Sequence, residues 1–227
     1  MEGVFQIGIG KHPLIYGLLV SAGYSSRMGS YKPLLDYKGV PFIIEILMKM
    51  GQICEKIAVV TGFKGDELES KVNQFLENAR AVSERDVKNM SGMSYGDLYK
   101  KIIFVHNPLF DEGMFGSLRS GLKALQNSDW LLYHFVDQPG LPAEFYTDFV
   151  TQLDGNYDWI QPKNRSGNGH PIFIGSTIYQ SILAANRNTT LKEVSRMADV
   201  KKKYWVCGYP QILEDIDTPD DYNKLSL

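Results

Sequence analysis

The amino-acid sequence predicts an α/β fold with a mostly parallel, twisted sheet that is flanked by helices on both faces. The apolar stretches are continuous and rich in β-branched residues, as in strands that are buried on both sides, and amphipathic segments separate them. The length of 227 residues fits one such domain, and no repeat or low-complexity linker divides the chain. We therefore expect residues 1–227 to form a single domain.

Strand and helix signals alternate along the first half of the chain. The expected elements are a strand at 14–21, a helix at 41–51, a strand at 56–61, a helix that begins at Gly65 and a strand at 102–106. Proline is favoured in a first helical turn, which suits Pro41 as the start of the first helix. The second helix carries Leu68, Val72 and Leu76 at helical spacing.

The second half continues this alternation. We expect helices at 116–126 and 142–153 with a strand at 130–136 between them, short strands at 159–161 and 172–174, helices near 177–185 and 190–197, and a strand at 204–206. Phe145 and Phe149 lie four residues apart, so they share one helix face.

Composition and charge exclude several function classes. The net charge is −2, so no basic field indicates nucleic-acid binding. No apolar run approaches the roughly 20 residues of a membrane span, and no signal-peptide pattern begins the chain. Cys54 and Cys207 are too few and too far apart for a disulfide scaffold or a zinc site, so we expect two buried, reduced thiols. These features favour a cytoplasmic enzyme that acts on small molecules.

A loop rich in glycine and serine follows the first expected strand and leads to two cations. It reads Gly-Tyr-Ser-Ser-Arg-Met-Gly-Ser-Tyr-Lys over residues 23–32. Glycine lets the backbone approach a ligand, successive amides can converge on anionic oxygens, and Arg27 and Lys32 supply donors for phosphate. The loop is neither a Walker A motif nor a dinucleotide-binding fingerprint. It predicts a phosphate site, and the alternative is a β-turn loop with two solvated cations.

Acidic residues follow the fourth expected strand and recur near the C-terminus. In an open parallel sheet, ligands bind outside the carboxyl ends of the strands, where Asp137 would face the loop. Asp137 is therefore a candidate ligand for Mg²⁺, which typically takes one or two protein carboxylates, although a turn-forming role is the alternative. Asp215 or Asp217 could complete the site. Asp217 or Thr218 could equally cap a helix that Pro219 begins.

Six short motifs occur in order along the chain. Residues 20–32 match the pattern L-A-A-G-x-S-x-R-M-G-x-x-K, and residues 107–122 match N-P…G-M-x-x-S-L-R-x-G-L. The others are Val-Val-Thr-Gly at 59–62, Asp-Gln-Pro at 137–139, Gly-His-Pro at 169–171 and Asp-Ile-Asp-Thr-Pro at 215–219. In this order the motifs resemble the molybdenum-cofactor nucleotidyltransferases, most of all the cytidylyltransferase type. The resemblance spans nearly the whole chain.

The resemblance implies a Rossmann-like nucleotidyltransferase fold and a Mg²⁺-dependent reaction. CMP from CTP would pass to the terminal phosphate of molybdopterin or the molybdenum cofactor, with release of pyrophosphate. By the family pattern, Arg27 would hold the β- and γ-phosphates, Lys32 would stabilise the α-phosphate, and Asp137 with Asp217 would bind the metal. Residues that would line the nucleotide site are Ser21, Ala22, Gly23, Ser25 and Ser26, together with Arg27 and Lys32.

Four further residues are candidates on the same resemblance. Ser117 and Arg119, near the start of the helix expected at 116–126, would also contact the nucleotide. Arg119 could instead be a surface residue paired with a carboxylate. Gly169 and His170 would contact the acceptor, although a histidine before proline in a tight loop is also compatible with a structural role.

The chain departs from the family pattern in places that bear on its substrates. Ser21 stands where the family usually has Ala, and Ala22 stands where the guanylyltransferase branch has Gly, which favours CTP over GTP. Residues 78–101 form an excursion that the family usually shortens, and we expect a mobile segment or an added helix there. The acceptor could also be a sugar phosphate or phosphocholine. A non-catalytic carrier or chaperone of the cofactor is a further alternative, and a molybdoenzyme that receives the product is the expected partner.

Overall fold

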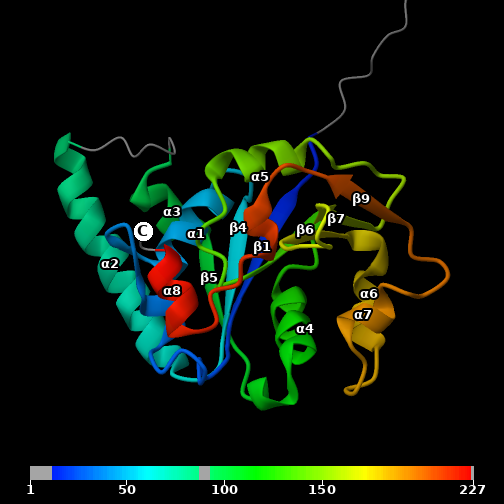
Figure 1. Cartoon of the computed structure of the whole chain (residues 1–227), viewed down its shortest axis with the longest axis horizontal. Helices are drawn as coiled ribbons and strands as arrows, with labels where there is room; N and C mark the ends of the chain where they lie inside the picture. The colour runs from blue at the N-terminus through cyan, green and yellow to red at the C-terminus, as the bar shows by residue number, and fades with distance from the viewer. Residues whose placement is uncertain (1–11, 87–92, 226–227) are drawn as a thin grey trace, which may run out of the picture.

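The computed structural model describes residues 12–86 and 93–225, and its main feature is one seven-stranded sheet with helices on both faces (Figure 1). The strands lie in the order β5-β4-β1-β6-β8-β7-β9. Their bounds are β1 Ile15–Ser21, β4 Lys56–Thr61, β5 Ile102–His106, β6 Trp130–Phe135, β7 Trp159–Lys163, β8 Ile172–Gly175 and β9 Lys202–Val206. A separate short hairpin pairs β2 (Asp36–Tyr37) with β3 (Val40–Pro41).

The strand pairing confirms the mostly parallel sheet. β5, β4, β1 and β6 run parallel to one another, and β7 runs parallel to β9. β8 pairs antiparallel with both β6 and β7, which the apolar patterns did not predict. The physical reason is the short connection at residues 164–171, because a parallel crossover needs about a dozen residues or more.

Helices cover the two faces of the sheet. Their bounds are α1 Phe42–Gly51, α2 Gly65–Asp86, α3 Tyr95–Lys101, α4 Met114–Ala124, α5 Ala143–Val150, α6 Tyr179–Ala184, α7 Leu191–Val194 and α8 Pro219–Leu225. One apolar core joins Ile43 of α1 and Phe145 of α5 to Leu19 of β1. The other joins Leu118 of α4 to Leu18 of β1, because neighbouring side chains of a strand point to opposite faces.

The expected excursion at 78–101 begins in one helix, α2, and ends in another, α3. α2 continues to Asp86, and α3 begins after Ser94, whose hydroxyl accepts the Asp97 amide at 3.0 Å. The added helix is therefore α3. Residues 87–92 of the excursion lie outside the described residues.

The structure also bears on two expectations from composition. Cys54 is buried as expected, whereas Cys207 is partly exposed, so the prediction of a buried thiol was wrong for Cys207. The reason is that Cys207 follows β9, the outermost strand of the sheet. Among the described residues, no helix has both the length and the apolar character needed to cross a lipid bilayer.

Two neighbouring strands position the candidate site. β1 and β6 pair in parallel, with Val20 opposite Phe135 near their carboxyl ends. The loop at 22–30 leaves β1 at that edge of the sheet, and Asp137 follows β6 at the same edge. β1 is also where the strand order reverses, since β4 lies on one side of it and β6 on the other. The prediction that both segments meet at one sheet edge is confirmed.

Candidate active site

The loop after β1 has a compact conformation and lines a cavity of about 330 Å³. Ser25 and Gly29 adopt positive φ angles of 56° and 68°. The Ser25 carbonyl accepts the Met28 amide at 3.0 Å, and its hydroxyl accepts the Lys32 amide at 3.1 Å. The cavity is lined by all seven loop residues predicted for the nucleotide, which are Ser21, Ala22, Gly23, Ser25, Ser26, Arg27 and Lys32.

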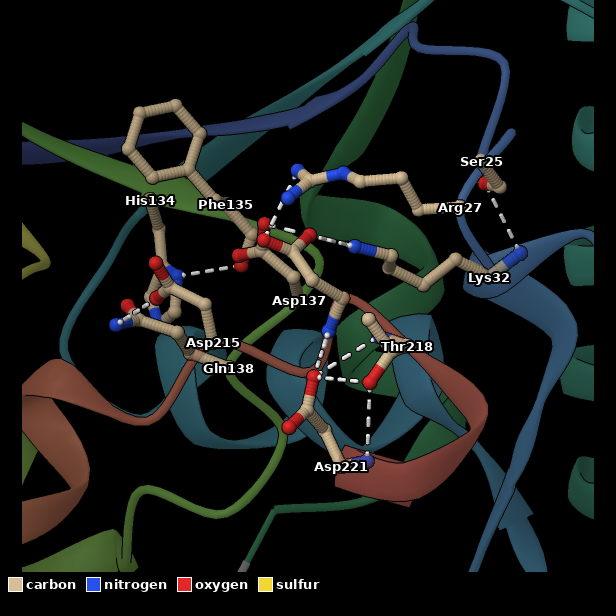
Figure 2. A network of polar contacts seen from close by, with 11 residues as sticks. Ser25, Arg27, Lys32, His134, Phe135, Asp137, Gln138, Asp215, Thr218 and Asp221 are labelled. Atoms are coloured by element: carbon tan, nitrogen blue, oxygen red, sulfur yellow. Dashed lines mark hydrogen bonds and ion pairs between the residues drawn. The ribbon is translucent and has the colours of Figure 1, made fainter.

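Two cations and two carboxylates face one another at this cavity (Figure 2). Lys32 Nζ lies 2.7 Å from Asp217 Oδ1 and 3.8 Å from Asp137 Oδ2. Arg27 Nη2 lies 2.9 Å from Asp217 Oδ2. The Lys32 side chain is 10% exposed and that of Arg27 is 72% exposed, so Lys32 is fixed in place whereas Arg27 reaches in from solvent.

Asp137 and Asp217 are about equally buried, with side chains 26% and 25% exposed. The Asp137 backbone carbonyl accepts the Ile216 amide at 2.8 Å, which ties the segment after β6 to the C-terminal acidic segment. Burial raises the pKa of Asp137 to about 6, the charge of Lys32 opposes this, and Asp215 and Asp217 add to it. Asp137 Oδ1 is buried, and no hydrogen-bond partner for it is found among the described residues. A buried carboxylate oxygen in this state is a suitable ligand for a cation.

The two C-terminal aspartates have different partners. Asp215 Oδ1 accepts the side-chain amide of Gln138 at 2.9 Å, and burial together with Asp217 raises the pKa of Asp215. Asp217 is paired with Lys32 and Arg27 instead. Thr218 caps α8, since its hydroxyl donates to Asp221 Oδ2 at 2.7 Å and accepts the Asp221 amide at 3.3 Å. The helix cap is therefore Thr218, and the Asp217 carboxylate points into the site.

The donor set suits a hard divalent cation that keeps most of its waters. The carboxylates of Asp137 and Asp217 both lie within 4.0 Å of the Lys32 ammonium group. Asp137 Oδ1 has no hydrogen-bond partner among the described residues, so its lone pairs are available to a cation. Within residues 12–86 and 93–225 there is no cluster of three or more His, Cys, Asp or Glu side chains arranged for a metal. Mg²⁺ needs no such cage, because it is commonly held by one or two carboxylates plus phosphate oxygens and water.

A larger cleft of about 1260 Å³ adjoins the first cavity. Both are lined by Arg27, Met114, Phe135, Asp137 and Asp217. The helices α4, α6 and α7 cover one face of the sheet (Figure 1). Residues of α4 and α7 line the larger cleft. Arg27, Asp137 and Asp217 therefore line both cavities at the place where the cavities meet, which we call the shared wall (Figure 2). Such a junction has room for two reactants whose reacting atoms meet at the wall.

The predicted acceptor residues differ in their access to the cleft. His170 lines it, packs its ring edge-on against Phe135 at a centroid distance of 4.8 Å, and has a buried Nδ1 for which no hydrogen-bond partner is found among the described residues. Burial lowers the pKa of His170 to about 4, so the ring is neutral at pH 7. Gly169 is not among the lining residues. A Cβ there would collide with the Ile212 carbonyl, which gives Gly169 a packing role.

The structure does not bring Ser117 and Arg119 to either cavity. The Ser117 hydroxyl is buried and accepts the side-chain amide of Asn107 at 3.1 Å. Arg119 Nη2 donates to the Leu183 carbonyl at 2.9 Å, which joins α4 to α6. Neither residue lines the two cavities described above. Their nucleotide contacts stay predictions, and the contacts seen here are structural.

One supporting residue was missed in the sequence. Lys49 Nζ donates to the Pro139 carbonyl at 2.8 Å and pairs with Glu45 at 2.8 Å. Lys49 on α1 therefore anchors the segment that contains Asp137. Burial lowers the pKa of Lys49, and the Glu45 charge opposes that shift. The available signal was a lysine inside an otherwise apolar helix with a glutamate four residues earlier.

Comparison with protein families gives one match over most of the chain. The model of the MobA-like NTP transferase domain matches residues 17–203. This segment contains the loop after β1, Asp137 and the strands that surround both cavities.

Curated proteins and solved structures agree with this match. Molybdenum cofactor cytidylyltransferase of Escherichia coli (strain K12) is 26% identical over 90% of this chain and 92% of its own. A protein of Bacillus cereus (strain B4264) named "Probable molybdenum cofactor guanylyltransferase" is 23% identical over 82% of this chain and 75% of its own. The structure of a nucleotidyl transferase from Methanothermobacter thermautotroptrophicus has a TM-score of 0.69 and 21% identity, and covers 93% of this chain and 95% of that one. This last likeness concerns the fold.

Proposed function

The chain belongs to the family of MobA-like NTP transferase domains and is a nucleotidyltransferase, and we propose that it transfers CMP from CTP to the terminal phosphate of molybdopterin or the molybdenum cofactor, with release of pyrophosphate. The observation that carries the proposal is the junction of two cavities at Arg27, Asp137 and Asp217. The smaller cavity takes the nucleotide and the larger one takes the acceptor. The α-phosphorus then lies at the shared wall, where the acceptor phosphate attacks it.

Lys32 and Arg27 serve different parts of the triphosphate. Attack at the α-phosphorus moves negative charge onto the surrounding oxygens and onto the leaving pyrophosphate. Lys32 is nearly buried and fixed, so its charge stabilises the α-phosphate in the transition state with little reorganisation. Arg27 is exposed and offers a planar set of donors, which suits the β- and γ-phosphates. Both cations leave Asp217 when the triphosphate binds.

Asp137 and Asp217 would hold Mg²⁺ at the same wall. The bound metal would neutralise phosphate oxygens as the charge develops. Asp217 becomes available for this role because the triphosphate takes over its two cationic partners. No side chain needs to remove a proton from the acceptor, since an acceptor phosphate is already anionic at neutral pH.

The choice of CTP rests on Ala22 and on the cytidylyltransferase relative. Ala22 lines the smaller cavity and is 4% exposed, so its methyl group takes up space at the nucleotide end. A guanylyltransferase is among the relatives too, so the base is the part of the proposal that most needs a direct test.

The proposal is tested by pyrophosphate release from each of the four ribonucleoside triphosphates with Mg²⁺, with and without molybdopterin. We expect release that requires both CTP and molybdopterin. Asp137→Asn should lose about 10²-fold or more of this activity because it removes a metal ligand charge. Asp199→Asn is the matched control, because Asp199 is exposed and lines neither cavity, and it should behave as the wild type.

Three results would contradict parts of the proposal. Pyrophosphate release with GTP as the only active nucleotide would mean that the enzyme uses GTP instead of CTP. Release with glucose 1-phosphate or phosphocholine in place of molybdopterin would mean that the acceptor is a different phosphorylated compound. Binding of molybdopterin without any pyrophosphate release would favour a carrier. Near-normal activity of Asp137→Asn would remove Asp137 from the reaction.

A further inference from the structure

The outer part of the larger cleft has a basic wall. Its cationic side chains are Arg187 in the turn before α7, Lys192 on α7, Arg196 just after α7 and Lys202 at the start of β9. The whole chain has a net charge of −2, so this local concentration of positive charge does not reflect the general composition. The wall lies on the part of the cleft formed by α7 and β9, away from the loop after β1.

Within the described part of the chain, one of these cations forms an ion pair and three do not. Arg187 lies 3.4 Å from Glu112. For Lys192, Arg196 and Lys202, no carboxylate lies within 4.0 Å among residues 12–86 and 93–225.

The nearby Glu193 offsets part of this charge, because its carboxylate interacts electrostatically with Arg196. The carboxylate of Glu193 on α7 accepts the Thr190 amide at 2.6 Å and the Thr190 hydroxyl at 2.9 Å, which closes the capping box of that helix. Lys202 Nζ reaches only the Ser195 hydroxyl, at 3.4 Å. The wall therefore keeps an excess of positive charge, since four cations stand against Glu112 and Glu193, and such an excess attracts anions.

Aromatic side chains line the cleft beside this wall. Trp159 is 5% exposed and its ring nitrogen donates to Gln161 at 3.3 Å. Tyr204 is 43% exposed on the neighbouring strand β9. Tyr133 and Phe135 pack edge-on at a centroid distance of 4.9 Å. These rings give the cleft rigid, largely apolar surface, which suits a planar ring of a ligand.

The inner end of the cleft has the opposite charge. It is lined by Asp137, Asp215 and Asp217, with Arg27 beside them. An acceptor that enters with its phosphate at this end needs the nucleotide site and its metal to offset the repulsion. The rest of the acceptor then lies along the aromatic side chains toward the basic wall.

We propose that the outer cleft is an acceptor subsite that selects a phosphorylated compound with a planar ring and a second anionic group besides the reacting phosphate, which in molybdopterin is the dithiolene. Lys192, Arg196 and Lys202 pair with this second group, and Trp159 and Tyr204 contact the ring. The inference rests on the proposed function and adds a charge rule to it. A neutral sugar monophosphate gains nothing from the wall, and the cationic tail of phosphocholine is repelled by it.

The test compares two double variants with equal charge changes. Lys192→Gln/Arg196→Gln removes two exposed cations of the wall, and Lys71→Gln/Lys123→Gln removes two exposed cations on α2 and α4 that line neither cavity. Equilibrium dialysis measures the binding of molybdopterin to CTP-loaded protein without Mg²⁺, at several salt concentrations. We expect the wall variant to raise the Kd for molybdopterin about tenfold or more and to flatten its salt dependence. The Kd for CTP should stay unchanged, and the control variant should match the wild type.

The outcomes separate this inference from the proposed function. Wild-type affinity and salt dependence in the wall variant would overturn the subsite, whether or not molybdopterin is turned over. If the wild type neither binds nor converts molybdopterin, the proposed acceptor is wrong, and the same proteins are titrated with glucose 1-phosphate and glucose 1,6-bisphosphate. A preference for the bisphosphate that is lost in the wall variant would support the charge rule. Equal affinity for the two sugars, or binding of neither, would overturn it.

Discussion

The two ends of the candidate site carry positive charge in different states. At the nucleotide end, Lys32 and Arg27 are both paired with Asp217. At the acceptor end, Lys192, Arg196 and Lys202 have no carboxylate within 4.0 Å among the described residues. In the proposed reaction, the first arrangement exchanges its ion pairs for two ligands of opposite sign, a triphosphate and a metal. The acceptor end has positive charge that can bind an anion without first breaking an ion pair.

The ends also differ in how the chain builds them. Seven of the residues that line the smaller cavity come from one segment, 22–32, which a single strand delivers to the sheet edge. The acceptor end is assembled from β6, β7, β8, α7 and β9, and depends on how these elements pack. A substitution at the nucleotide end should therefore act on chemistry, whereas one at the acceptor end should act on affinity.

Lys32→Ala provides the largest test of this difference. We expect kcat to fall by about 10²–10³-fold, because a preorganised charge at the α-phosphate acts mainly in the transition state. The Kd for CTP should change much less than kcat. Stopped-flow or quenched single turnovers measure the first quantity, and metal-free titration measures the second. Lys71→Ala is the control, and equal losses in kcat and CTP binding would contradict the assignment.

The contrast explains what the sequence could predict. Local order is enough for Arg27, Lys32 and the loop between them, since one strand and one turn position them. Asp137 followed from a general rule, because the carboxyl ends of parallel strands meet at one edge. The basic wall could not be predicted in this way. Lys192 and Lys202 line the same cleft although they lie on α7 and β9, and β9 pairs with β7 instead of β8, the strand that precedes it in the chain, which no local pattern encodes.

Supporting contacts are the other part that local patterns miss. Ser117 and Arg119 lie in a motif-like segment, but α4 directs them to Asn107 and to the Leu183 carbonyl. Lys49 supports the Asp137 segment across 90 positions of sequence. Such contacts depend on the tertiary packing of helices, which residue spacing alone does not specify.

A buried histidine at each end of the site should make stability depend on pH. Burial lowers the pKa of His134, behind the nucleotide end, to about 3 and that of His170, at the acceptor cleft, to about 4. Below the unfolded pKa of about 6.5, the unfolded chain gains protons that the folded chain does not, so stability falls with pH until the folded pKa is reached. We expect His134 to account for about 2 kcal/mol of lost stability between pH 7.5 and 5.

Urea unfolding of wild type and His134→Gln at both pH values measures this effect. His134 contacts the Tyr146 hydroxyl at 2.7 Å and the Phe135 carbonyl at 2.8 Å, so the variant is also expected to be less stable at pH 7.5. The informative quantity is the loss between the two pH values, which should be about 2 kcal/mol smaller in the variant. The same loss in both proteins would mean that His134 is protonated in the fold. His170→Gln gives the matching measurement for the acceptor end.

Ala22→Gly tests whether base choice belongs to the nucleotide end. The Ala22 methyl group lies at the carboxyl end of β1 and lines the smaller cavity. Its removal enlarges the cavity by one methyl group, which should favour a purine and lower the CTP:GTP ratio of kcat/KM about tenfold. Competition between the two nucleotides in one reaction measures the ratio. An unchanged ratio would place base selection elsewhere in the site.

Asp217→Asn addresses the paired charges directly and should have the smallest effect. In the metal-free protein, a triphosphate must displace Asp217 from Lys32 and Arg27 before it can bind them. Removing that carboxylate charge should therefore tighten metal-free CTP binding about threefold to fivefold, even though the same change removes a proposed metal ligand and should lower turnover. Asp215→Asn is the matched control, because Asp215 accepts from Gln138 rather than from either cation, and it should give less of the gain. Calorimetric titration without Mg²⁺ measures both. If Asp217→Asn weakens metal-free binding, the ion pairs at the nucleotide end organise the two cations for phosphate instead of competing with it, and the contrast with the unpaired acceptor end loses its energetic basis.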